Sequence, residues 1–225
     1  MSALRGLLRP ARQETYEKVF GMVYVGLMTN LLLAISCAPL LVVLALVRNP
    51  LASWPFFALL SAVCAPALAG AFRCFALLDE GSTAVFTAFW NGYRRAAARA
   101  LVTWLTGAAV MSVLVVDVMV VAGISWGPAL LPFFVTAGAL VVAVTVATLV
   151  VVAESSRPVR DLVLPCLYLV ARRWYLTLPT LMVLALAVGV VLLKPLFGVL
   201  LVTAPLLYVA WATSRFVVLP LLPKP

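Results

Sequence analysis

The chain has 225 residues, of which 66% are hydrophobic and 10% are charged, and it contains no histidine. A soluble domain carries roughly 25% charged residues, so water cannot solvate the surface of a protein with this composition. The formal charge of +9 is better explained by basic residues at the ends of membrane spans, facing anionic lipid headgroups, than by a nucleic-acid partner. We therefore predict an all-α membrane protein that sits in a lipid bilayer as one compact helical bundle and binds no nucleic acid.

Six apolar runs are long enough to cross a membrane, because about 20 apolar residues span roughly 30 Å of hydrocarbon. In chain order the predicted spans are 22–47, 54–78, 101–123, 128–153, 175–193 and 195–214. Only Lys194 and Pro195 separate the last two. A proline breaks a helix and a lysine is costly in mid-membrane, so we predict a tight turn there. The predicted organisation is an N-terminal cytoplasmic segment 1–20, a six-span domain 21–216 and a C-terminal cytoplasmic tail 217–225.

The basic residues predict the orientation of the spans. The leader and the second and fourth connections carry eleven lysines and arginines, whereas the other three connections carry only Arg48 and Lys194. Basic residues are retained on the cytoplasmic side of a membrane. Both termini are therefore expected in the cytoplasm.

The second-to-third connection is predicted to be an amphipathic helix. Ser82 or Thr83 can cap its start, and aromatic residues recur on one helical face. Arginines follow at its far end. The candidate partner-contact residues in this segment are Phe86, Phe89, Trp90, Tyr93, Arg94 and Arg95.

The fourth-to-fifth connection, from Glu154 to Trp174, predicts a second amphipathic helix. Its apolar stripe comprises Leu162, Val163, Cys166, Leu167 and Val170. Arg172, Arg173 and Trp174 end it and are further candidate partner contacts. Each of the two helices can either dock on another subunit or lie in the headgroup layer.

The sequence offers no residues for catalysis. It has no histidine base, no glycine-rich phosphate loop and no nucleophile motif, and its four cysteines are not spaced as metal ligands. We predict a protein that is not an enzyme and holds no cofactor or metal.

Two charged residues lie within predicted spans, Asp117 and Arg73. A charge in the bilayer interior usually faces protein or water and has a partner. Asp117 is either a proton- or substrate-coupling acid or an acid near the outer end of its helix, protonated or paired with a hydroxyl or Arg48. Arg73 either snorkels to the headgroups or pairs with Asp79 or Glu80.

Two stretches carry a resemblance to a known family. The run Cys64–Phe72, with small residues around Pro66, resembles the second span of the YesL-like membrane proteins, a domain of unknown function. The stretch Phe86–Arg95 is similar to that family's aromatic and basic connection into the third span. Where Ala65 precedes the proline, the family is expected to have glycine.

This resemblance implies an accessory subunit of a carbohydrate ABC import system in a bacterial cytoplasmic membrane, with the ABC permease as its partner. It implies no catalytic residues. The alternative is a small stand-alone transporter or channel that uses Asp117 and the proline-kinked spans.

Overall fold

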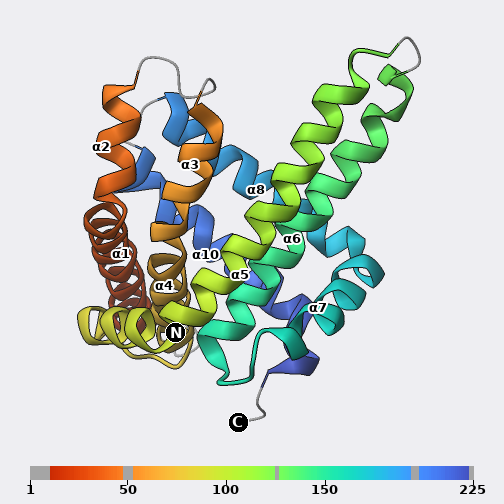
Figure 1. Ribbon diagram of the computed structural model, residues 1–225. Coiled ribbons are helices and arrows are strands. Elements are labelled where there is room, and N and C mark those ends of the chain that lie inside the picture. The colour runs from red at the N-terminus through yellow and green to blue at the C-terminus, as the bar shows by residue number, and fades with distance from the viewer. Residues whose placement is uncertain (1–10, 48–52, 125–126, 194–197, 223–225) are drawn as a thin grey trace, which may run out of the picture.

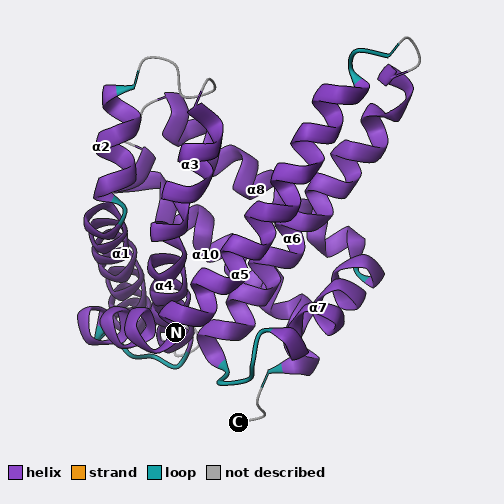
Figure 2. Cartoon of the chain, viewed as in Figure 1, coloured by secondary structure: helices purple, strands orange, loops and turns teal. Residues whose placement is uncertain are grey.

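The computed structural model describes residues 11–47, 53–124, 127–193 and 198–222. The described part of the chain is helical and contains no strand (Figure 2). Five of its helices are long and apolar enough to cross a membrane, and a sixth span results if one bent pair is counted. The prediction of an all-α polytopic membrane protein is confirmed.

The first predicted span, 22–47, is divided into two helices. They are α1 (Ala11–Ser36) and α2 (Ala38–Leu46), and their apolar portions meet at an angle of 68°. Pro39 lies in the first turn of α2. Because proline has no N–H to donate to the preceding turn, the helix bends there.

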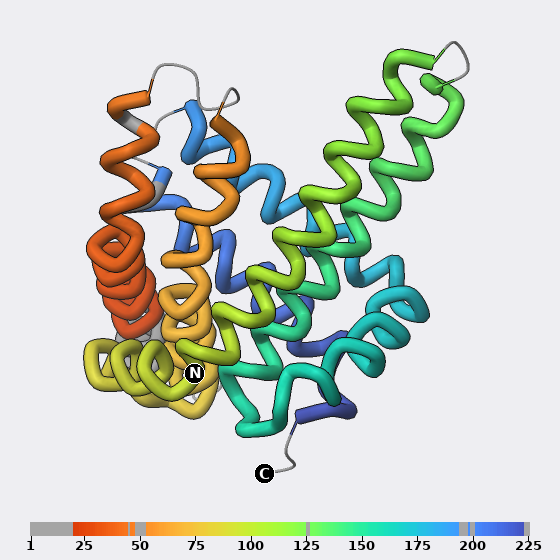
Figure 3. Tube along the Cα trace, viewed as in Figure 1, coloured from red at the N-terminus to blue at the C-terminus, as the bar shows by residue number. Residues whose placement is uncertain are grey.

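The second and third predicted spans are present, with one difference in how they are joined. Helix α3 (Trp54–Leu60), a short turn η2 (Ser61–Val63) and α4 (Cys64–Asp79) form the second span. Helix α5 (Val85–Val121) includes both the predicted connecting helix and the third span, so the first connecting helix is not a separate element. Figure 3 shows that α5 changes direction along its length.

In the second half of the chain the fourth and fifth spans lie where they were predicted, whereas the sixth runs Thr203–Leu221 instead of 195–214. The elements of this half are η3 (Gly127–Leu130), α6 (Leu131–Glu154), α7 (Arg160–Arg172), α8 (Trp174–Leu193), η4 (Gly198–Val202), α10 (Thr203–Val218) and η5 (Leu219–Leu221). Helix α7 is the second connecting helix, as predicted. The predicted turn at Lys194 and Pro195 lies outside the described residues.

Helices α4 and α5 pack more closely than side chains usually allow. A Cβ placed on Gly92 would lie 2.8 Å from Arg73 Cβ and 3.2 Å from Gly70 Cα, and one on Gly70 would lie 2.9 Å from the Phe89 carbonyl oxygen. In membranes the burial of apolar surface contributes little to helix association, because lipid tails are apolar too. Helices associate there by close backbone approach at small residues. The core extends from this crossing over α6 and α10, with Phe72, Phe89 and Trp211 among its largest buried side chains.

Helices α5 and α6 form an antiparallel hairpin (Figure 1). The far end of this hairpin stands apart from α2 and α3, whereas its other end packs on α4 and α7. We call the end that carries Arg94, Arg99, Arg173 and Arg215 the basic end of the bundle. Helix α1 approaches the basic end near Thr83. A Cβ placed on Gly21 of α1 would lie 3.7 Å from Thr83 Cγ2.

Candidate functional site

The aromatic stripe predicted to contact a partner is largely used within the fold. Phe89 is completely buried against α4, and Trp90 and Tyr93 are half-buried with ring centroids 5.4 Å apart. Phe86 is exposed. The stripe is therefore the face on which α5 packs, and Phe89 cannot contact a partner in this conformation. Arg94 and Arg95 remain exposed.

The stripe of α7 also packs on the bundle. Leu162, Cys166 and Val170 are buried against it, at the i, i+4, i+8 spacing that the sequence predicted. Arg172 is exposed and donates to Tyr168 Oη at 3.2 Å, and Trp174 is exposed at the start of α8.

Two arginines bind the carbonyl ends of helices. Arg173 Nη1 donates to the Phe216 carbonyl at 2.9 Å, at the end of α10. Arg99 Nη1 donates in the same way to the Ser155 carbonyl, at the end of α6. A cation at a helix C-terminus satisfies carbonyls without partners and offsets the helix dipole. Arg173, predicted to contact a partner, is thus occupied within the fold.

An ionic cluster that the sequence did not predict joins three spans at the basic end. Arg215 on α10 donates to Asp79 Oδ2 at 2.8 Å and to Glu154 Oε2 at 3.2 Å. Trp211 Nε1 donates to the other oxygen of Glu154 at 3.3 Å, and the Arg215 guanidinium lies 5.1 Å from the Trp211 ring centroid. Asp79 and Glu154 are the last residues of α4 and α6, so the cluster fixes three helix ends.

The two intramembrane charges take different positions. Arg73 is half-buried on α4 and, among the described residues, forms no ion pair, since Asp79 pairs with Arg215 instead. Asp117 is exposed on α5, four residues before that helix ends, and has no hydrogen-bond or ion-pair partner in the part of the chain that the structure describes. It lines none of the pockets described next.

A cleft separates the α5–α6 hairpin from α8. Its outer part has a volume of about 890 Å³ and is open to the outside of the bundle, and a second part of about 360 Å³ reaches α3 and α4. Both parts share Met111, Val115 and Leu184. Two of the polar groups in the second part are partners of one another, because Trp104 Nε1 donates to Ser61 Oγ at 2.9 Å.

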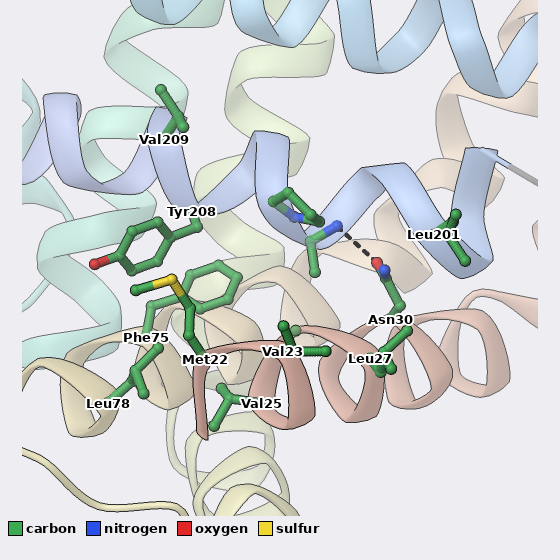
Figure 4. A pocket seen from close by; sticks show the side chains of 13 residues that line it. Met22, Val23, Val25, Leu27, Asn30, Phe75, Leu78, Leu201, Tyr208 and Val209 are labelled. Carbon is green, nitrogen blue, oxygen red and sulfur yellow. Dashed lines mark hydrogen bonds between the residues drawn. The ribbon is translucent and has the colours of Figure 1, made fainter. Parts of the chain in front are cut away.

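A second pocket, of about 440 Å³, lies between α1, α4 and α10 (Figure 4). Its walls are apolar apart from Asn30 and Tyr208. Asn30 is 1% exposed, and its Oδ1 accepts a hydrogen bond of 2.6 Å from the Ala204 N–H. This contact was not predicted from the sequence; the signal that could have indicated it is an asparagine within an apolar run, because buried polar side chains in spans hydrogen-bond across helices.

The structural features described above are pockets between helices and contacts that hold the helices together. No group of three or more histidine, cysteine or acidic side chains in the described ranges is placed to hold a metal ion. No family model, curated protein or solved structure matches the chain.

Proposed function

We propose that this protein is a non-catalytic subunit that binds a transmembrane helix of another protein in the cleft between the α5–α6 hairpin and α8. On the resemblance to the YesL-like proteins, the partner is the permease of a carbohydrate ABC importer. The proposed location is a bacterial cytoplasmic membrane with the basic end in the cytoplasm, in keeping with the positive-inside rule.

The observation that carries the proposal is the cleft. No residue in the most apolar window of α5 is buried by the rest of the chain, and α8 is buried only to a small extent. Exposed apolar side chains alone fit lipid as well as protein. A cleft between two helices, in contrast, allows a helix of another protein to pack against this chain on two sides.

Small residues line the cleft where a helix would approach. Ala185 and Gly189 lie one turn apart on α8, and Gly138 and Ala139 on α6 line the same cleft. A small-xxx-small pattern lets two helix backbones come close, and membrane helices associate through such packing. A Cβ on Gly189 meets nothing within 4 Å, so space is free above it.

Co-purification with the permease tests the proposal. A tagged chain extracted in mild detergent is expected to retain the carbohydrate ABC permease of the same cell, and Gly189→Leu is expected to lower the retained permease about tenfold by filling the cleft. Gly26→Leu, the same change at a glycine that also has free space around it but lies in the other pocket, should leave it unchanged. Recovery of the chain alone, in detergent that keeps the transporter intact, would contradict the proposal.

The same experiment distinguishes the partner. If the tagged chain retains a second copy of itself in place of the permease, and if Gly189→Leu dissociates that dimer, the permease assignment is overturned.

A further inference from the structure

Helix α7 has two different faces. Leu162, Cys166 and Val170 face the bundle and are buried. On the opposite face Leu164 is 73% exposed and Tyr168 is 61% exposed. These two side chains are four residues apart, so they are neighbours along the surface of the helix. The outer face is therefore largely apolar at its centre, although no part of the described chain covers it.

Arg172 continues this outer face one turn further on, in the last turn of α7. Its Nη1 donates to Tyr168 Oη at 3.2 Å, and its guanidinium carbon lies 5.9 Å from the centroid of the same ring. A guanidinium has five N–H donors, and no carboxylate in the described ranges forms an ion pair with Arg172. Its positive charge and most of its donors are therefore available to an anion.

Two exposed aromatic residues follow Arg172 at the start of α8. Trp174 is 63% exposed and Tyr175 is 59% exposed. The intervening Arg173 is held within the fold by the Phe216 carbonyl. Tryptophan and tyrosine are enriched at the two surfaces of a bilayer, where the apolar ring and its polar group both find a suitable environment. The junction of α7 and α8 has the composition of such an interfacial site.

The fold places this junction at a membrane surface. Helix α7 has 13 residues, too few to cross about 30 Å of hydrocarbon, and it connects the spans α6 and α8 on the outside of the bundle (Figure 1). A charged Arg172 is costly in hydrocarbon, whereas the exposed Leu164 and the aromatic rings are not stabilised by water. The headgroup layer accommodates both kinds of side chain.

We propose that the junction of α7 and α8 binds an anionic phospholipid of the surrounding bilayer. The lipid phosphate accepts hydrogen bonds from Arg172, and the exposed aromatic rings around it lie beside the glycerol and the first acyl carbons. The headgroup of phosphatidylglycerol keeps a net negative charge, whereas the choline of phosphatidylcholine cancels the charge of its phosphate. The positive charges of Arg172 and Arg173 therefore favour the anionic lipid.

Native mass spectrometry of the full chain, released from micelles with equal amounts of phosphatidylglycerol and phosphatidylcholine, tests the proposal. The unmodified chain is expected to retain phosphatidylglycerol in preference to phosphatidylcholine. Arg172→Gln should lower the ratio of the two retained lipids about fivefold, the effect of one basic residue at an anionic surface. Arg172→Lys keeps the charge and should keep most of the preference. Trp174→Ala removes a ring but no charge, so it should lower the retention of both lipids.

Arg94→Gln is the matched control, because it removes the same charge at an exposed arginine of the basic end. The aromatic neighbours of Arg94, Trp90 and Tyr93, are half-buried and contact one another within the fold. The lipid ratio should therefore stay unchanged.

Three results would overturn the proposal. They are the absence of a preference in the unmodified chain, equal losses in Arg172→Gln and Arg94→Gln, and a loss in Arg172→Lys as large as that in Arg172→Gln. The outcome is independent of the proposed permease contact, because Arg172 and Trp174 do not line the cleft.

Discussion

Arg215 donates from Nε to Glu154 Oε2 over 3.2 Å, and this contact joins the last turn of α10 to the end of α6. The Glu154 side chain is 9% exposed, whereas the other acid bound by Arg215, Asp79, is 56% exposed. The two ion pairs are therefore expected to contribute differently to the stability of the fold, since solvent screens an exposed pair far more than a buried one.

We expect Arg215→Gln to lower the free energy of unfolding by roughly 1.5–3 kcal/mol, because hydrogen bonds to a mostly buried carboxylate are lost. In a chain of this length that lowers Tm by about 3–12 °C, measured in detergent. Asp79→Asn should cost only about 0–1 kcal/mol. Glu154→Gln should lower the free energy of unfolding more than Asp79→Asn does, and equal losses of stability in these two variants would contradict the prediction.

Gly92→Ala is expected to destabilise the bundle, because the added Cβ would lie 2.8 Å from Arg73 Cβ and 3.2 Å from the Gly70 backbone. Overpacking of this kind costs about 1–3 kcal/mol. Gly138→Ala is the matched control, since its nearest neighbour is Met111 Sδ at 3.6 Å, an ordinary contact. Thermal unfolding of the two variants side by side checks the prediction, and equal Tm values would refute the close crossing of α4 and α5.

Arg173→Gln should lower stability by about 1–2 kcal/mol, because the guanidinium binds the Phe216 carbonyl at the end of α10. Arg94→Gln, at an exposed arginine at the same end of the bundle, should change it by less than about 0.5 kcal/mol. Unfolding by heat in detergent measures both. A comparable loss in Arg94→Gln would show that overall charge, rather than the helix end, is responsible.

The orientation of the bundle can be measured by cysteine labelling after the four native cysteines are replaced. Asn91, in the N-terminal part of α5, and Ile124, three residues beyond its C-terminal end, are both exposed. If the basic end is cytoplasmic, a membrane-impermeant maleimide added to intact cells labels Ile124→Cys, and Asn91→Cys only after permeabilisation. The reverse pattern would place the arginines outside.

Asp117→Asn is expected to leave Tm unchanged, because the described structure gives this side chain no partner and places it outside the pockets. Proteoliposomes that contain only this protein should show no solute uptake that depends on Asp117. Uptake that Asp117→Asn abolishes would favour the stand-alone transporter over the accessory subunit.

The sequence predicts the spans well because each depends on local composition. The run 54–78 matches the span Trp54–Asp79 almost to the residue, and the buried stripe of α7 follows from its i, i+4 spacing. The break at Ser36 and the continuity of α5 were missed. Both depend on how neighbouring helices pack, which periodicity does not report.

The candidate sites were harder to predict, because they join residues far apart in the chain. Glu154 and Arg215 are 61 residues apart, and each lies just beyond the end of a predicted span. The aromatic stripe around Phe89 was correctly placed on one helical face. A single sequence cannot say whether such a face meets a partner or, as here, the chain's own α4.

The contact between Asn30 and Ala204 bears on how the protein is made. The two residues are 174 positions apart, and α1 is synthesised first and α10 last. At about 5–20 residues per second, Asn30 precedes its donor partner, the Ala204 N–H, by on the order of 10–35 s of synthesis. Throughout that interval the Asn30 oxygen on α1 lacks the N–H that it binds in the folded protein, so this contact between the first and last spans forms only after the whole chain has been synthesised.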